Sequence, residues 1–470
     1  MARFDMAALK RAAYELTERL TTPAVSPPRP SPQNSTCTRR ILALALTPEQ
    51  RIEKFKQLLL MHEVPMERFR RLVFAEGVPE AGSQEGALRA IAWKLLLGYL
   101  PADRSCWDKL LTERRASYQI FCDELAIDPR GAVEASAAER HIDVSEAISQ
   151  GPAVEVSVAC AASSSAFTAS ADHPLSSAEG STWAEWHADE AQRAEIRKDV
   201  DRTLPEYAFF NREQPLGRLH NAAISRVLFI YAKLNPGIKY VQGMNEMLAP
   251  IYYVFCLEMD DHRQGLPPAA DRTTEDPADS LPPRVEAAMA AVEADAFFCF
   301  TALMAEVRDH FCSKLDHTEL GITAKVNRME DLIAAKDHEL GAMLRRNKVS
   351  PTFYGFRWIT LLLTQEWDLP DVLRLWDSLF ADEHRFEFLM YFCAATVLSI
   401  RHELLEADDF AFAVKALQRF EARVPIHKLL ASAVVLYRQD YPEPPLPPTP
   451  EMPQSVLGIP LGRADDLKAA

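Results

Sequence analysis

The sequence has no apolar run long enough to cross a bilayer and no excess of basic residues. Its longest apolar runs, such as Ile251 to Leu257, are far shorter than the roughly 20 residues of a spanning helix. Lysine and arginine number 52 against 67 aspartates and glutamates, which gives a net charge of −15. General nucleic-acid binding and strong docking on anionic membranes are therefore disfavoured, because both depend on clustered cations.

The chain also lacks the cysteine pairs of a metal or redox site. Its eight cysteines are scattered and form no CxxC pair, and several lie inside apolar helical runs. Free cysteine in such runs behaves as a small hydrophobic residue. We therefore expect reduced thiols rather than disulfides or zinc ligands.

The common catalytic and nucleotide-binding motifs are absent as well. The sequence contains no GxxxxGK[ST] phosphate loop and no GxGxxG after a predicted strand. No HExxH occurs, since His338-Glu339 and His402-Glu403 lack the second histidine, and no GxSxG lies in a strand-turn-helix setting. We therefore expect neither a nucleotide nor a cofactor to be held by this chain itself.

Helical periodicity runs through most of the chain and predicts an all-α fold. Ile224, Val227, Leu228 and Tyr231 repeat at helical spacing, as do Leu375 and Leu379 in a later segment. Thr47-Pro48 is typical of a helix start with proline at the first position. Strand-like alternation occurs at residues 153–158, but this run lies in a biased segment and does not predict a sheet.

Compositional breaks divide the chain. The composition of residues 1–46 predicts a mobile extension. A short amphipathic helix is expected at residues 4–20, and a proline cluster ends it. Residues 126–182 are rich in alanine and serine, and 260–283 are rich in proline and aspartate, so both predict mobile insertions. Residues 441–470 form a proline-rich tail.

One pair of segments carries residues suited to chemistry. Residues 196–202 place Asp199 and Arg202 three apart, which predicts a shared helix face. About forty residues later, Gln242 is expected at the start of another helix, after a Pro-Gly turn. Arginine keeps its charge and can clamp developing negative charge, while glutamine can aim a water molecule. The combination suits phosphoryl transfer to water on a nucleotide that a partner protein holds.

Each of these residues also has an ordinary structural interpretation. Arg202 alone would be a solvated surface arginine, and its pairing with Asp199 would stabilise a helix by only about 0.2–0.5 kcal/mol. Tyr240 and Gln242 could simply begin a helix. The catalytic interpretation therefore depends on the complete motifs in which these residues lie.

Those motifs resemble the TBC-domain family, GTPase-activating proteins for Rab GTPases. Residues 196–202 match its IxxDxxR signature through Ile196, and residues 240–242 match YxQ. Residues 86–101 resemble a further TBC signature with Arg89 and Trp93 in an RxxxW pattern, and residues 356–358 and 375–380 resemble its C-terminal segment. The resemblance covers about residues 75–430, and the long gap before Ile196 resembles the subgroup numbered thirteen.

This resemblance implies a function and roles for individual residues. Arg202 would be an arginine finger and Gln242 a glutamine finger, both acting in trans on the Rab. Asp199 would orient Arg202 or contact the Rab, Tyr240 would support the glutamine loop, and Ile196 would complete the motif. Arg89 and Trp93 would be structural, with the tryptophan in the core and the arginine bonded to nearby backbone or acids.

The resemblance also implies partners and location. The partner would be a GTP-bound Rab, and GTP and Mg²⁺ would belong to that Rab, so no cofactor of this chain is expected. A role in vesicle traffic and a cytoplasmic location, peripheral at endomembranes, would follow. A non-catalytic Rab-binding adaptor and a helical scaffold are the alternatives. The intact finger pair disfavours the first, and the lack of a 34- or 40-residue repeat disfavours the second.

Overall fold

The structure is a computed structural model of the whole chain, and it describes residues 48–79, 87–125, 182–259, 283–311, 321–420 and 424–443. The predicted extension and the strand candidate lie outside these residues. So do the two insertions, apart from their last residues, and the tail from residue 444. The predictions for those segments stay predictions.

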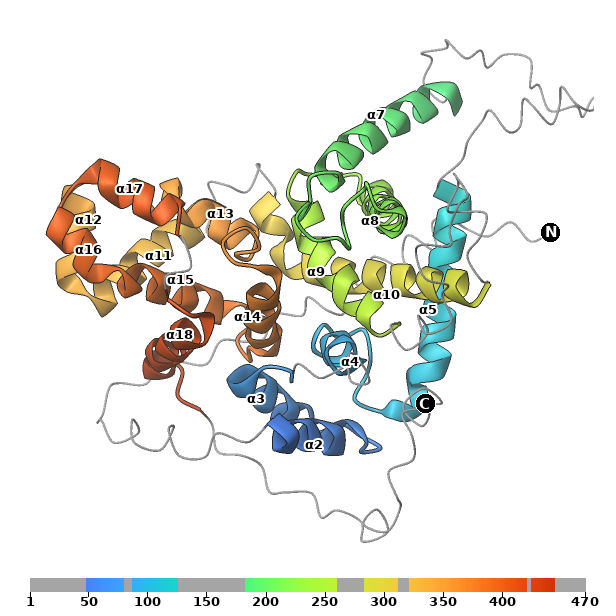
Figure 1. Cartoon of the computed structure of the whole chain (residues 1–470), viewed down its shortest axis with the longest axis horizontal. Helices are drawn as coiled ribbons and strands as arrows, with labels where there is room; N and C mark the ends of the chain where they lie inside the picture. Colours follow the sequence, from blue (N-terminus) through green and yellow to red (C-terminus); the bar gives the residue numbers. More distant parts are fainter. Residues whose placement is uncertain are drawn as a thin grey trace, which may run out of the picture.

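The described residues are helical and contain no strand, which confirms the predicted all-α class. Only an isolated antiparallel bridge joins Glu63 and Asp103. The α-helices, labelled as in Figure 1, are α2 (Pro48–Leu59), α3 (Met66–Glu76), α4 (Ala87–Leu96), α5 (Trp107–Leu125), α7 (Thr182–Val200), α8 (Pro215–Leu234), α9 (Met244–Leu257), α10 (Pro283–Val307), α11 (Ile322–Lys336), α12 (His338–Arg346), α13 (Gly355–Thr360), α14 (Leu369–Ala381), α15 (Glu387–Ser399), α16 (Arg401–Ala407), α17 (Phe410–Gln418) and α18 (Ile426–Asp440). Short 3₁₀ turns are η1 (Arg104–Cys106), η5 (Arg308–Phe311) and η7 (Pro351–Phe353).

Local sequence signals explain where several helices begin. Helix α2 begins at Pro48, as predicted, and proline also occupies the first turn of α8 and α14. Proline fits there because the first amides of a helix have no partner inside the helix. Asp337 caps α12 by accepting from the amide of Leu340, and the side chain of Asp409 caps α17 in the same way.

The helices form two groups joined by a layer between them (Figure 1). Helices α5 and α7–α10 form one group, with α9 and α10 packed together, and α11–α13 and α15–α18 form the other. Helix α14 lies between the groups and contacts α3, α4, α9, α15 and α18. Trp93 of α4 and Trp376 of α14 are fully buried, with ring centroids 5.9 Å apart. The predicted apolar positions of α8 and α14 are all buried.

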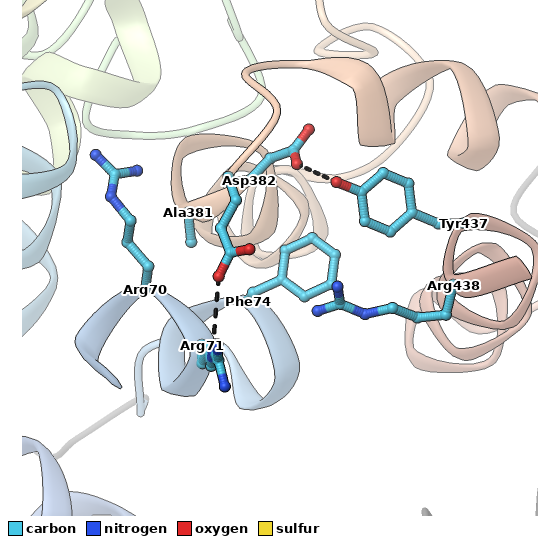
Figure 2. Close-up of a pocket in the computed structure, with 8 residues that line it drawn as sticks. Arg70, Arg71, Phe74, Ala381, Asp382, Tyr437 and Arg438 are labelled. Carbon is cyan, nitrogen blue, oxygen red and sulfur yellow. Dashed lines mark hydrogen bonds and ion pairs between the residues drawn. The ribbon is translucent and has the colours of Figure 1, made fainter. Parts of the chain in front are cut away.

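The packed body extends on both sides of residues 75–430. Helix α3 packs on α14, and α18 completes the same corner of the molecule (Figure 2). There the hydroxyl of Tyr437 donates to Asp382 at 2.6 Å, and the guanidinium of Arg438 lies 5.3 Å from the ring of Phe74. The helices that flank the predicted family segment therefore share its core.

Helix α10, continued by η5, is long and apolar enough to cross a membrane, with a mean hydropathy of 1.5. The uninterrupted apolar runs of the sequence are too short to indicate this property. However, 67% of that apolar window is buried inside the fold. Its buried Glu293 pairs with Arg226 at 2.6 Å, and its buried Asp295 lies 2.8 Å from both Lys94 and Arg115. These pairs mark α10 as the central core helix of its group. Helices α15 and α16 are long and apolar enough to cross a membrane only if they are taken together as one span, and the two helices are bent by 54° relative to each other.

No disulfide joins the cysteines of the described residues. Cys256, Cys299 and Cys393 are buried on α9, α10 and α15. Cys122 is partly buried, and Cys106 is exposed. The buried thiols pack as small apolar side chains, as expected from the apolar runs in which they lie.

Candidate catalytic site

Arg202 lies in the turn that follows α7, and not on the helix itself. Helix α7 ends at Val200, and the last i to i−4 bond runs from the amide of Asp201 to the carbonyl of Arg197 at 2.8 Å. The next amides bond three residues back, as in the 3.3 Å bond from Arg202 to Asp199. The prediction of a shared helix face was therefore wrong for Arg202, because the chain tightens into a turn at this point.

Asp199 and Arg202 nevertheless pair as the spacing indicated. A guanidinium nitrogen of Arg202 lies 2.6 Å from a carboxylate oxygen of Asp199. Asp199 is buried, whereas the side chain of Arg202 is 58% exposed. Ile196, one turn earlier on α7, is fully buried and anchors the helix end in the core. A buried carboxylate therefore holds one side of an arginine whose other side faces solvent.

Gln242 lies in a second turn, directly before α9. After α8 the chain turns at Pro236-Gly237, as predicted, and α9 begins two residues after Gln242. The side chain of Gln242 is exposed, while Gly243 is buried with a φ of 103°. A β-carbon on Gly243 would lie 2.7 Å from Cδ2 of Leu361. Glycine is therefore required at this position both for backbone conformation and for space.

Tyr240 links the two turns through the carboxylate of Asp199. Its hydroxyl donates to the second oxygen of Asp199 at 2.6 Å. Burial and then this hydrogen bond raise the pKa of Tyr240 far above its ordinary value. Tyr240 thus stays a protonated donor at all physiological pH values. Asp199 is thus shared between Tyr240, which lies two residues before Gln242, and Arg202.

Asn245 forms a second link that the sequence did not single out. Its amide nitrogen donates to the hydroxyl of Thr203 at 2.8 Å and to the carbonyl of Asp199 at 3.3 Å. Its amide oxygen accepts from the amide of Gly243 at 3.1 Å and from the hydroxyl of Tyr240 at 3.3 Å. The only signal in the sequence was its place in the same run as Gln242, three residues further on.

The surroundings of Arg202 are acidic. Besides Asp199, the carboxylate of Glu246 lies near enough to interact electrostatically with Arg202, and the carboxylate of Glu206 in turn lies near that of Glu246. Burial raises the pKa of Glu246, and a hydrogen bond with Gln365 opposes that change. The negative charges favour retention of the guanidinium in the turn while no partner is present.

This arrangement suits charge stabilisation and water placement better than proton transfer or nucleophilic attack. Its two exposed side chains are a cation that does not titrate at physiological pH and a neutral amide. In the described part of the chain, no group of three or more histidine, cysteine, aspartate or glutamate side chains gathers to hold a metal ion.

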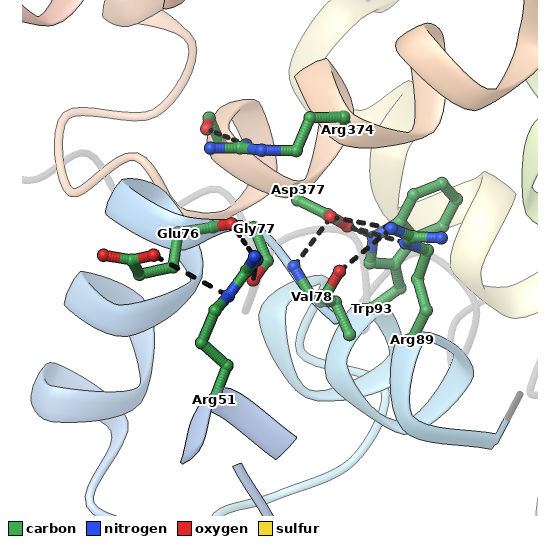
Figure 3. A network of polar contacts seen from close by, with 9 residues as sticks. Arg51, Glu76, Gly77, Val78, Arg89, Trp93, Arg374 and Asp377 are labelled. Carbon is green, nitrogen blue, oxygen red and sulfur yellow. Dashed lines mark hydrogen bonds and ion pairs between the residues drawn. The ribbon is translucent and has the colours of Figure 1, made fainter. Parts of the chain in front are cut away.

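Arg89 and Trp93 take part in a different network, on the inner side of α4 (Figure 3). The indole nitrogen of Trp93 donates to Asp377 at 2.8 Å, and the guanidinium of Arg89 bonds the same carboxylate and the carbonyl of Val78. The amide of Val78 adds a 2.9 Å bond to Asp377, which is fully buried. Both residues thus tie α4 to α14, as the structural interpretation predicted.

Comparison with known proteins agrees with the motifs and the fold. The family model of the Rab-GTPase-TBC domain matches residues 173–405, a segment that contains both turns. TBC1 domain family member 13 from Homo sapiens is 33% identical over 432 residues, covering 79% of this chain and 94% of that protein. The mouse protein of the same name gives the same identity and coverage.

A solved structure shares the architecture. The Ypt/Rab-GAP domain of Gyp1p superposes with a TM-score of 0.57 at 22% identity, over 83% of this chain and 98% of that one. At that identity the likeness concerns the fold. Taken with the matched family segment and the relatives at 33% identity, it places this all-α chain with its Asp199–Arg202 and Tyr240–Gln242 turns in the Rab-GTPase-TBC domain family.

Proposed function

We propose that this protein accelerates GTP hydrolysis by a Rab-family GTPase, with Arg202 and Gln242 acting in trans. The observation that carries the proposal is the joining of two turns by Asp199, Tyr240 and Asn245. Each turn leaves one exposed side chain of the required chemistry next to this buried connection. Family membership supports the coarser part of the proposal, a Rab partner.

The chemistry follows from charge. In GTP hydrolysis the transferred phosphoryl group passes through a loose transition state with negative charge spread over its oxygens. The guanidinium of Arg202 stabilises that charge, and an arginine supplied in trans is worth roughly 10³–10⁵ in rate. Gln242 both donates and accepts hydrogen bonds, so it orients the attacking water. Asp199 orients Arg202, and Tyr240 holds Asp199.

The partner supplies the remaining parts. GTP and its Mg²⁺ are bound by the Rab and reach Arg202 and Gln242 with it. We propose a cytoplasmic protein that acts at the surface of endomembranes, where its Rab resides, in vesicle-mediated transport. The net charge of −15 is consistent with recruitment through a protein partner rather than through anionic lipid.

A hydrolysis screen tests the proposal. The full chain is added to a panel of GTP-loaded Rabs, and phosphate release is followed over time. We expect strong stimulation of at least one Rab and a fall on the order of 10²–10³ in kcat for Arg202→Lys, because lysine lacks the planar fork. Arg212→Lys is the matched control, since Arg212 is also an exposed arginine (64% exposed) and pairs with Asp201, the residue directly before Arg202.

A transition-state mimic separates this proposal from a non-catalytic adaptor. A Rab with GDP and aluminium fluoride mimics the planar phosphoryl group, and a two-finger activator binds that form much more tightly than the GDP form. Gln242→Ala should weaken that complex, also with a Rab whose own glutamine is replaced. An adaptor would instead prefer plain GTP, and Arg202→Lys with wild-type kcat would remove the catalytic role.

A further inference from the structure

We infer that Asn245 is the positioning residue that sets the two fingers at a fixed separation, and this inference rests on the proposed function. Asn245 is 3% exposed, so it does not meet a partner. Its side-chain amide instead lies between the turn that carries Arg202 and the turn that carries Gln242. Both turns are bonded by this one planar group.

Each side of the amide serves a different turn. The nitrogen side bonds Thr203 and the carbonyl of Asp199, which are the residues on either side of the Arg202 turn. The oxygen side accepts from the amide of Gly243, the residue directly after Gln242. Because the donor and acceptor of one amide are rigidly spaced, the two backbones that bear the fingers are held at a distance set by that amide.

The contacts differ from those of an ordinary helix cap. Asn245 is the second residue of α9, and its oxygen bonds backward to Gly243 rather than to a free amide in the first turn of its own helix. Thr203 is 1% exposed and completes the link, since its hydroxyl donates to the carbonyl of Asp199 at 3.0 Å. The bonds therefore run between segments more than 40 positions apart in the sequence.

Catalysis by two fingers makes this link consequential. Arg202 and Gln242 must act on one phosphoryl group and one water at the same moment, so their separation matters more than the place of either alone. A displacement of about 1 Å can reduce a rate by roughly 10²-fold. Binding of the Rab depends much less on this separation, because the fingers contact only a small part of a standard interface.

The test compares kcat with KM in four variants of the full chain. For Asn245→Ala we expect kcat for the stimulated Rab to fall by about 10–10²-fold, with KM within about threefold. Thr203→Val removes the hydroxyl on the opposite side of the link and keeps the volume of the side chain. It should lower kcat in the same direction, and the double variant should lose about as much as Asn245→Ala alone.

Asn221→Ala is the matched control. Asn221 is also a buried asparagine, 6% exposed, and its nitrogen donates to the backbone carbonyl of Phe210 at 3.0 Å. Its loss should lower the melting temperature by a similar amount and leave kcat within about twofold. Hydrogen exchange gives a readout independent of activity, since residues 199–203 and 240–243 should exchange faster in Asn245→Ala and not in Asn221→Ala.

Four outcomes decide the inference. Asn245→Ala with the stability loss of the control and an unchanged kcat would overturn it. Losses in kcat that multiply in the double variant would also overturn it, since the two groups would then act separately. If Asn245→Ala does not fold, Thr203→Val decides by the same criteria. If Arg202→Lys keeps the wild-type kcat, the proposed function is wrong, and the inference about catalysis is wrong with it. Faster exchange of residues 199–203 and 240–243 in Asn245→Ala would then show only that Asn245 joins the two turns structurally.

Discussion

Replacement of Gly243 by alanine should disturb the glutamine turn in a measurable way. The residue has a φ of 103°, a conformation that costs a residue with a side chain about 1–3 kcal/mol. The new methyl would lie 2.7 Å from Cδ2 of Leu361, and moving that side chain off its rotamer costs about 0.5–1.5 kcal/mol. Reduced entropy of the unfolded chain returns about 0.4–1 kcal/mol.

These contributions leave a net destabilisation of about 0.5–4 kcal/mol. Urea unfolding measures it as a lower midpoint at an unchanged slope. Stimulated Rab hydrolysis should fall by about tenfold or more in kcat, because Gln242 directly precedes the strained position.

Gly237→Ala is the control, since a β-carbon there meets nothing within 4 Å and its φ is not positive. It should shift the urea midpoint little or upward. Equal midpoints for the two variants would refute the assignment of strain to Gly243. A stability loss without a loss of kcat would show that the turn does not control Gln242.

Two further outcomes are expected elsewhere in the fold. Asp377→Ala should lower the free energy of unfolding by about 3–5 kcal/mol, because it leaves Arg89 buried without its carboxylate and Trp93 without its acceptor. Urea unfolding measures this loss, and a value below about 1 kcal/mol would contradict the account. Burial, and then the charge of Lys325, lower the pKa of His310 from 6.5 to about 3. Neutral His310 therefore contributes stability that is complete above pH 6.5 and is lost as pH falls toward 3, by about 2 kcal/mol at pH 5. His310→Gln should flatten this part of the stability profile, and unchanged pH dependence of the urea midpoint would count against it.

The sequence predicted the helices well where burial follows a regular period. In α8, Ile224, Val227 and Leu228 repeat at the helical period and are all buried. The membership of Arg202 and Gln242 in two separate motifs was equally clear from residue order.

The ends of the elements were less predictable, because tertiary contacts set them. Leu204 and Lys239 have φ values of 43° and 62° near the two finger turns, and neither residue type announces such a conformation. The Arg202 turn is bonded by Asn245, which lies more than forty positions away in the sequence. No local pattern could therefore show that Arg202 lies beyond the end of α7, or that an unremarkable asparagine joins the two motifs.

The acidic pairs of α10 have a consequence for synthesis. Glu293 and Asp295 lie in an apolar helix, and their cationic partners Lys94, Arg115 and Arg226 all precede it in the chain. Because a chain emerges from the ribosome N-terminus first, these cations exist before α10 does. This largely buried helix is thus made last among its partners, when its carboxylates can be neutralised at once. A permuted chain that began with α10 would make these two carboxylates before any of the cations that neutralise them, so it would have to bury α10 later in synthesis than the natural order allows.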